Sequence, residues 1–126
     1  MLIPTECEMK LLKHIWVAEQ MSAADIHAAS AADTGWTYSS TRKTLDRMVE
    51  KKLVRIMDES LRPRIYSARV GKLETIAALS TDFVRNMLDS PAPLPMAVFA
   101  QSRLVNAAEL GTLDRLLNGA DAPSLT

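Results

Sequence analysis

Residues 37–51 read TYSSTRKTLDRMVEK, and this stretch decides the fold. A helix is predicted to begin at Thr37 or Tyr38, just after the helix-breaking residues 33–35, and to run to about Lys51. One face of this helix consists of Thr41, Leu45, Met48 and Val49. Side chains at this spacing share one side of a helix, so they predict the surface that packs against a core.

The opposite face of the predicted helix is polar and exposes Ser39, Arg42, Lys43 and Asp46. Hydroxyl and backbone N–H groups at a helix N-terminus hold phosphate, and an arginine can bond guanine O6 and N7 together. The pattern therefore indicates a DNA-reading helix, with Arg42 as the expected base reader. Taken alone, Arg42, Lys43 and Arg47 fit equally well as charges that keep an exposed helix face in water.

The neighbouring segments place this helix in a larger unit. Two capping patterns open predicted helices over residues 5–19 and 22–32, each with an apolar face. Downstream, residues 53–57 and 64–68 are short strand-like runs around a polar loop, which predicts a β-hairpin. Three helices followed by a hairpin predict a winged helix-turn-helix domain over residues 1–70, in which the third helix enters the DNA major groove.

The distribution of charge supports the same interpretation, although the formal net charge is zero. Residues 37–69 hold nine lysines and arginines against four acidic residues, a net charge of +5, and the flanking segments are acidic. A cationic helix and a cationic hairpin tip on one side of a fold predict DNA binding, whereas the tip alone would fit a soluble turn. The predicted DNA-binding residues are Ser39, Ser40, Arg42, Lys43, Arg47, Arg62 and Arg64.

Residues 71–126 are predicted to form a helical dimerisation region. A helix over residues 72–88 carries apolar side chains at heptad-like spacing, three prolines within residues 91–95 interrupt it, and two further helices follow from Met96 and from Asn106. This stripe could pack within one chain, but the segment looks too short and elongated to bury its own apolar face, so a subunit interface is expected. The predicted interface residues are Leu73, Ile76, Phe83, Met87, Phe99, Leu110, Leu113 and Leu117.

Several other classes of protein and site are excluded. Paired catalytic carboxylates, a glycine-rich phosphate loop and a Ser-His-Asp arrangement are all missing from the sequence, so we expect no enzyme and no cofactor. Cys7 and His14 lie about two helical turns apart and His27 is isolated, so no metal site is expected. The chain has no apolar run of about 20 residues and no signal-peptide pattern, which predicts a cytoplasmic protein without a membrane partner.

Nearly the whole chain resembles the penicillinase-repressor family of the BlaI, MecI and CopY type. The matching residues are Thr5-Glu6, Ile15-Trp16, Ser22 to Ile26, Tyr38 to Arg47, Val49 to Lys51, Arg62 and Tyr66. The resemblance implies a winged-helix transcriptional repressor whose third helix contacts DNA through Ser39, Ser40, Arg42 and Lys43. It also implies dimerisation through the carboxy-terminal helices and a palindromic double-stranded DNA operator.

The same resemblance suggests how repression ends. In the antibiotic-resistance members, a signalling protease leads to cleavage before a phenylalanine of the dimerisation arm, and Phe99 is similar to that position. Val98 stands here in place of the asparagine that precedes it, so cleavage at Val98–Phe99 is a hypothesis beside a structural role for Phe99 as a core aromatic of the dimer. The cysteine cluster of the copper-responsive relatives has no counterpart near the carboxy terminus, which argues against copper sensing of that kind.

Two further functions compete with a protease-released repressor. Winged helices also dock partner proteins, so the domain could be a protein-interaction module. Alternatively, release could follow binding of a small ligand, with Trp36 or Phe83 lining its pocket. Loss of any DNA preference would favour the first alternative, and thermal shifts with candidate compounds would favour the second.

Overall fold

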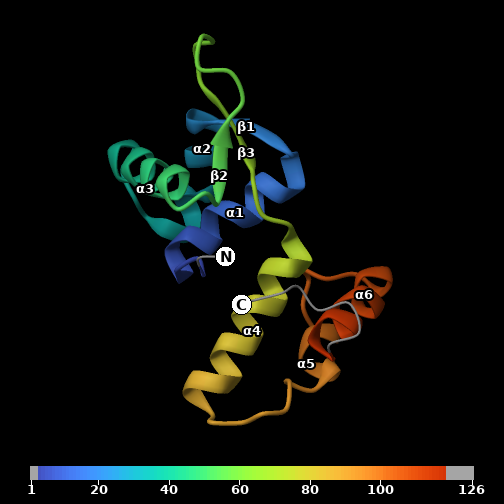
Figure 1. Ribbon diagram of the computed structural model, residues 1–126. Coiled ribbons are helices and arrows are strands. Elements are labelled where there is room, and N and C mark those ends of the chain that lie inside the picture. The colour runs from blue at the N-terminus through green and yellow to red at the C-terminus, as the bar shows by residue number, and fades with distance from the viewer. Residues whose placement is uncertain (1–2, 119–126) are drawn as a thin grey trace. The chain divides into compact units, whose positions relative to one another are not determined.

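The computed structural model describes residues 3–118, which Figure 1 shows as a ribbon. The chain divides into two compact units between Val70 and Gly71. The first unit contains α1 (Glu6–Ala18), β1 (Gln20–Ser22), α2 (Ala23–Thr34), α3 (Tyr38–Glu50), β2 (Val54–Ile56) and β3 (Ile65–Ala68). The second unit, over residues 71–118, contains α4 (Lys72–Met87), α5 (Met96–Ala100) and α6 (Ala107–Leu117). The predicted fold class, mainly helical with a small β component, is confirmed.

Hydroxyl side chains cap the helices of the first unit where the sequence predicted. At α1, Thr5 Oγ1 accepts the Glu8 N–H while the Glu8 carboxylate accepts the Thr5 N–H, so two N–H groups that lack helical partners are satisfied together. Ser22 and Thr37 cap α2 and α3 in the same way. Helix α2 extends two residues beyond its predicted end and stops at Gly35, whose φ of 66° is left-handed and costs glycine little.

The three strands form one antiparallel sheet in which β3 lies between β1 and β2 (Figure 1). Tyr66 at the centre of β3 pairs with Met21 of β1 on one side and with Ile56 of β2 on the other. The hairpin was predicted, and its loop is the wing. Strand β1 was not predicted, because its residues Gln20–Ser22 show no apolar alternation and become a strand only by pairing with β3.

The core of the first unit receives side chains from all three helices and from the hairpin. Its fully buried members are Leu11, Leu12, Ile15, Ile26, Leu45, Met48, Leu53, Val54 and Tyr66. The predicted inner face of α3 is therefore correct, with Leu45 and Met48 completely buried and Val49 packed at the edge. Since truncating a buried leucine or methionine to alanine costs about 2–5 kcal/mol, these contacts hold α3 in one rotational setting.

One ion pair joins the beginning of α1 to the end of α3. Lys51 Nζ lies 2.5 Å from Glu8 Oε1 and also donates to the Ile3 carbonyl oxygen at 3.5 Å. Burial of Glu8 raises its pKa, but the hydrogen bonds from Lys51 and Thr5 and the charge of Lys51 outweigh this and hold the pKa below the usual glutamate value. Glu8 is thus a buried carboxylate that depends on Lys51 for its charge to be tolerated.

The second unit has a core of its own, which corrects one expectation. We expected residues 72–117 to be unable to bury their apolar face within one chain, yet Ile76, Ala77, Phe99, Val105 and Leu113 are buried together there. The proline-rich segment after α4 ends that helix and lets the chain turn, so that α6 packs back against α4 and the apolar faces of both are buried. Lys72 stabilises the return by pairing with Glu109 at 2.7 Å and donating to the Leu104 carbonyl oxygen at 2.9 Å.

Helix α5 is shorter than predicted. It ends at Ala100, whereas the helix predicted to begin at Met96 was expected to run to about Leu104. Beyond it the Ser102 N–H donates to the Phe99 carbonyl oxygen and the Ser102 hydroxyl accepts the Leu104 N–H. A serine that bonds nearby backbone in this way competes with helix continuation.

Within residues 3–118, no helix is both long enough and apolar enough to cross a bilayer.

We expect Lys51→Met to lower the free energy of unfolding by about 1–3 kcal/mol at pH 7, because it leaves the Glu8 carboxylate buried without its cation. The contribution of this pair is complete above the ordinary glutamate pKa of about 4.3 and is lost as the pH falls through the lower pKa of Glu8 in the folded protein. Urea titrations of both proteins at pH 7 and at pH 3 measure this, and the two stabilities should converge at the lower pH.

Lys13→Met is the matched control, since Lys13 is an exposed lysine of α1 and its loss should change stability by less than about 0.5 kcal/mol. Equal losses in the two variants at both pH values would show that the Glu8–Lys51 pair has no specific role.

Candidate nucleic-acid interface

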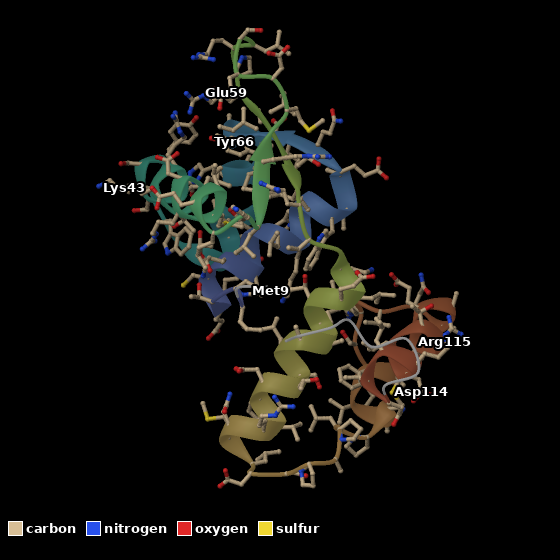
Figure 2. The ribbon with its side chains drawn as sticks, viewed as in Figure 1. Met9, Lys43, Glu59, Tyr66, Asp114 and Arg115 are labelled. Carbon is tan, nitrogen blue, oxygen red and sulfur yellow. The ribbon has the colours of Figure 1, made fainter. Side chains whose placement is uncertain are left out.

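The outer face of α3 is exposed and cationic. Ser39, Arg42, Lys43 and Arg47 are all exposed, and the side chain of Lys43 extends away from the helix in Figure 2. Ser39, Lys43 and Arg47 follow one another at four-residue intervals, so they form a row along the helix. Because Leu45 and Met48 fix the opposite face in the core, this row cannot rotate inward.

Polar contacts near the buried side of α3 reinforce this setting. The Thr44 hydroxyl donates to the Ser40 carbonyl oxygen at 3.0 Å and accepts from Arg47 at 3.3 Å. Thr41, completely buried, lies 2.9 Å from His27 Nδ1 of α2. Helices α2 and α3 are therefore joined by a hydrogen bond as well as by apolar packing, and α2 supports the exposed face that follows it.

Ser40, one of the predicted DNA-binding residues, takes part in the N-terminal cap of α3. Its N–H donates to the Thr37 hydroxyl at 3.2 Å, and the Thr37 hydroxyl lies 3.1 Å from Ser40 Oγ. These bonds form the N-terminal cap of α3, which leaves Ser39 as the hydroxyl of the first turn placed on the outer row.

Arg42 is held against Tyr38, one turn earlier in α3. Its guanidinium carbon lies 6.0 Å from the centre of the Tyr38 ring, within the range of a cation–π contact. A hydrogen bond with Tyr38, followed by the electrostatic effects of Tyr66 and Tyr38, raises the pKa of Arg42. Tyr38 itself meets His27 edge to face, with ring centres 5.7 Å apart. Arg42 thus contacts the Tyr38 ring, which in turn packs against His27, and its side chain is more restricted in conformation than that of Lys43.

The wing loop between β2 and β3 carries the remaining predicted cations. Asp58 accepts both the N–H and the hydroxyl of Ser60, and these bonds lower the pKa of the Asp58 carboxyl. Arg62 donates to the carbonyl oxygens of Glu59 and Leu61, which ties its guanidinium to the loop. Arg64 is half-buried at the foot of the loop.

A pocket brings the helix and wing cations together. Its volume is about 240 Å³, and Arg42 of α3 lines it together with Arg62 and Arg64 of the wing. Ala23 and Ala24 at the start of α2 form another wall. The other lining residues are Tyr38, Pro63 and Tyr66. Three of the seven predicted DNA-binding residues therefore converge here, while Ser39, Lys43 and Arg47 lie on the outer row of α3.

Sequence reasoning missed the two tyrosines of this pocket as candidate site residues. Tyr66 was expected only as a strand residue of the wing, and Tyr38 only as a residue at the start of a helix. The four-residue spacing of Tyr38 and Arg42 could have indicated their contact. The position of Tyr66 could not be found this way, because it depends on how β3 pairs with β1 and β2 and packs against α1.

The predicted dimerisation residues fall into two groups. Ile76, Phe99 and Leu113 are buried in the core of the second unit, and Leu73, Leu110 and Leu117 pack against it. By contrast, Phe83 and Met87 are exposed on α4, at 47% and 73% of their surface.

The residues proposed for release occupy equally different environments. Val98 is exposed and Phe99 is buried, and the peptide bond between them lies inside α5. Phe99 thus belongs to the core of its own unit, while its role in a dimer core and cleavage at this bond both stay predictions. Trp36, suggested as a ligand contact, packs at the edge of the core of the first unit.

The comparison with known families agrees with this geometry. The sequence matches the penicillinase repressor family over residues 4–119, a range that includes both units and all the predicted DNA-binding residues of α3 and the wing. No curated protein matches the chain. The family is one of DNA-binding transcriptional repressors with a winged-helix domain, as the cationic α3 and wing indicate. The chain belongs to the penicillinase repressor family.

Proposed function

We propose that this protein represses transcription as a homodimer that places one α3 in each of two half-sites of a palindromic operator. The observation that carries the proposal is the convergence of the α3 and wing cations in one unit, with α3 fixed by its buried face. A fixed cationic helix beside a cationic wing suits a major groove flanked by phosphates. The two half-sites would lie one DNA helical turn (about 34 Å) or two turns apart. A dimer bound in this way would exclude polymerase from a promoter.

The contacts within each half-site divide into two kinds. Lys43 and Ser39 lie on the outer row of α3 and are proposed to face base edges, with Arg47 further along the same row. Arg42 was our expected base reader, but its contact with Tyr38 and its place beside Arg62 and Arg64 favour a phosphate contact instead. Phosphate contacts position a protein on DNA without reading its sequence.

Dimerisation is proposed to use the second half of α4. Phe83, Met87 and Leu88 are exposed at that end, whereas the first half of the helix is covered by the core of its own unit. Exposed apolar side chains grouped on one element are typical of a subunit interface. A dimer doubles the number of cationic contacts with DNA, so it supports a tighter complex than one reading head could make.

The first test is selection of double-stranded oligonucleotides from a random pool, followed by binding measurements over a range of salt concentrations. We expect a palindromic consensus, and an affinity whose logarithm falls linearly with the logarithm of salt, with a slope near −0.9 for each neutralised phosphate. Enrichment of no sequence, together with weak binding to every duplex, would instead support the protein-interaction module.

Substitutions in α3 test the division between base and phosphate contacts. Arg42→Ala should weaken binding by about 1–3 kcal/mol for all duplexes alike, whereas Lys43→Ala should relax the preference at one base position. Fluorescence anisotropy with a set of single-position operator variants measures both effects. The reverse pattern, relaxed preference for Arg42→Ala alone, would return Arg42 to the role of base reader.

The exposed end of α4 is tested by Phe83→Asp. A carboxylate buried at the interface should raise the dimer dissociation constant at least tenfold, which corresponds to about 1.4 kcal/mol, and operator affinity should fall with it. Sedimentation equilibrium measures the association. Arg85→Asp is the matched control, because it introduces the same carboxylate two residues away, on the other side of the helix, and should leave the dimer intact. Equal weakening by both variants would argue against this interface.

A further inference from the structure

The pocket between α3 and the wing has the charge of an anion site. Arg42, Arg62 and Arg64 all line it, and none of its lining residues is acidic. Two of these arginines are already oriented, since Arg42 lies over Tyr38 and Arg62 is tied to the loop carbonyls of Glu59 and Leu61. A guanidinium has five N–H donors, so the loop bonds of Arg62, made through one nitrogen, leave donors for a ligand.

The beginning of α2 contributes backbone donors to the same pocket. Ala23 and Ala24 are the first two residues of this 12-residue helix, and both line the pocket. N–H groups in the first turn have no acceptor within the helix, and the helix dipole places partial positive charge there. The Ser22 hydroxyl accepts the N–H of Asp25, three residues further on. Alanine side chains are small, so an anion can approach this backbone closely.

The hydroxyl of Tyr66 is the second and independent observation. Tyr66 is completely buried and lines the pocket, and within residues 3–118 its hydroxyl has no hydrogen-bond partner. Buried polar groups are nearly always bonded, so an unbonded one calls for an explanation. Tyr66 and Arg42 line the same pocket, so the ring and the guanidinium face a common space. A ligand that accepts a hydrogen bond there would satisfy it.

We propose that this pocket binds a phosphate group, with Arg42, Arg62 and Arg64 supplying positive charge and the Tyr66 hydroxyl and the α2 N-terminus supplying directed donors. Phosphate oxygens accept hydrogen bonds from several directions, which matches donors arriving from α2, α3 and the wing. The volume of about 240 Å³ leaves room for what the phosphate is attached to. The group is either a phosphodiester of the DNA backbone, an assignment that rests on the proposed function, or a free phosphate or phosphate ester.

The Tyr66→Phe variant separates a ligand role from a structural one. Removing an unpartnered buried hydroxyl while keeping the ring leaves the packing unchanged, so the Tm should stay the same or rise. Phosphate binding should weaken about tenfold or more, as expected for loss of one hydrogen bond to a charged acceptor. Stability and binding would thus move independently, which a packing residue would not produce.

Ser80→Ala is the matched control. Ser80 Oγ is the other buried side-chain atom without a partner among the described residues, and it lies on α4 in the second unit. Its removal deletes the same kind of group but should leave phosphate binding unchanged. Arg64→Gln is a second test of the pocket, and it should weaken binding without touching the Tyr66 hydroxyl.

Two measurements distinguish the sources of the phosphate. In the first, inorganic phosphate is titrated at constant ionic strength into ¹⁵N-labelled protein, and shifts of the Ala23, Ala24 and arginine N–H signals are followed. In the second, the selected operator is prepared with a neutral methylphosphonate at one backbone position at a time. If a DNA phosphate occupies the pocket, neutralising it at one backbone position should weaken binding of the unmodified protein more than it weakens binding of Tyr66→Phe, because the variant has already lost one of the hydrogen bonds to that phosphate.

The possible results lead to different conclusions. Loss in the operator measurement assigns the pocket to the DNA backbone, and loss only in the phosphate titration assigns it to a free phosphate compound. Retention of both affinities in Tyr66→Phe and Arg64→Gln would overturn the proposal even if the protein binds its operator normally. Failure to bind any DNA would overturn the proposed function, and the phosphate titration would still decide the role of the pocket.

Discussion

The pairing of β3 on both of its edges is the constraint on which the first unit depends. β1 precedes α2 and β2 follows α3, so a strand that binds both closes the chain around the two helices between them. Tyr66 occupies the centre of this arrangement, paired with Met21 on one edge and Ile56 on the other. β3, which forms one side of the wing, therefore also fixes where α2 begins. Its pairing with β1 and β2 likewise fixes the positions of the cations on α3 and the wing.

This arrangement joins stability and binding in one residue. The Tyr66 ring belongs to the core, whereas its hydroxyl gains no bond from the protein and costs about 1–3 kcal/mol if it stays unsatisfied. Phenylalanine would fill the same space without that cost. A hydroxyl kept under such a penalty, in a pocket lined by three arginines, is better explained by binding than by folding.

The sequence predicted those features that depend on neighbouring residues. The caps at Thr5 and Ser22 were found because a capping side chain bonds a backbone N–H only three residues further along the chain. Strand β1 and the core of the second unit were missed because each depends on a partner distant in the chain. The pocket itself was outside prediction for the same reason, since α2, α3 and the wing meet only in the fold.

The two halves of α4 separate folding from proposed assembly within the second unit. Ile76 and Ala77 in the first half are covered by Phe99 and the α6 residue Leu113, while Phe83 and Met87 in the second half stay exposed. A cut between Val98 and Phe99 would free Phe99 and α6 from the turn that returns them to α4. The effect on the dimer would be indirect, because the cut would expose the buried first half of α4 and would not itself remove any residue of the exposed second half. Release of this kind would act by unfolding the support of the interface rather than by removing the interface.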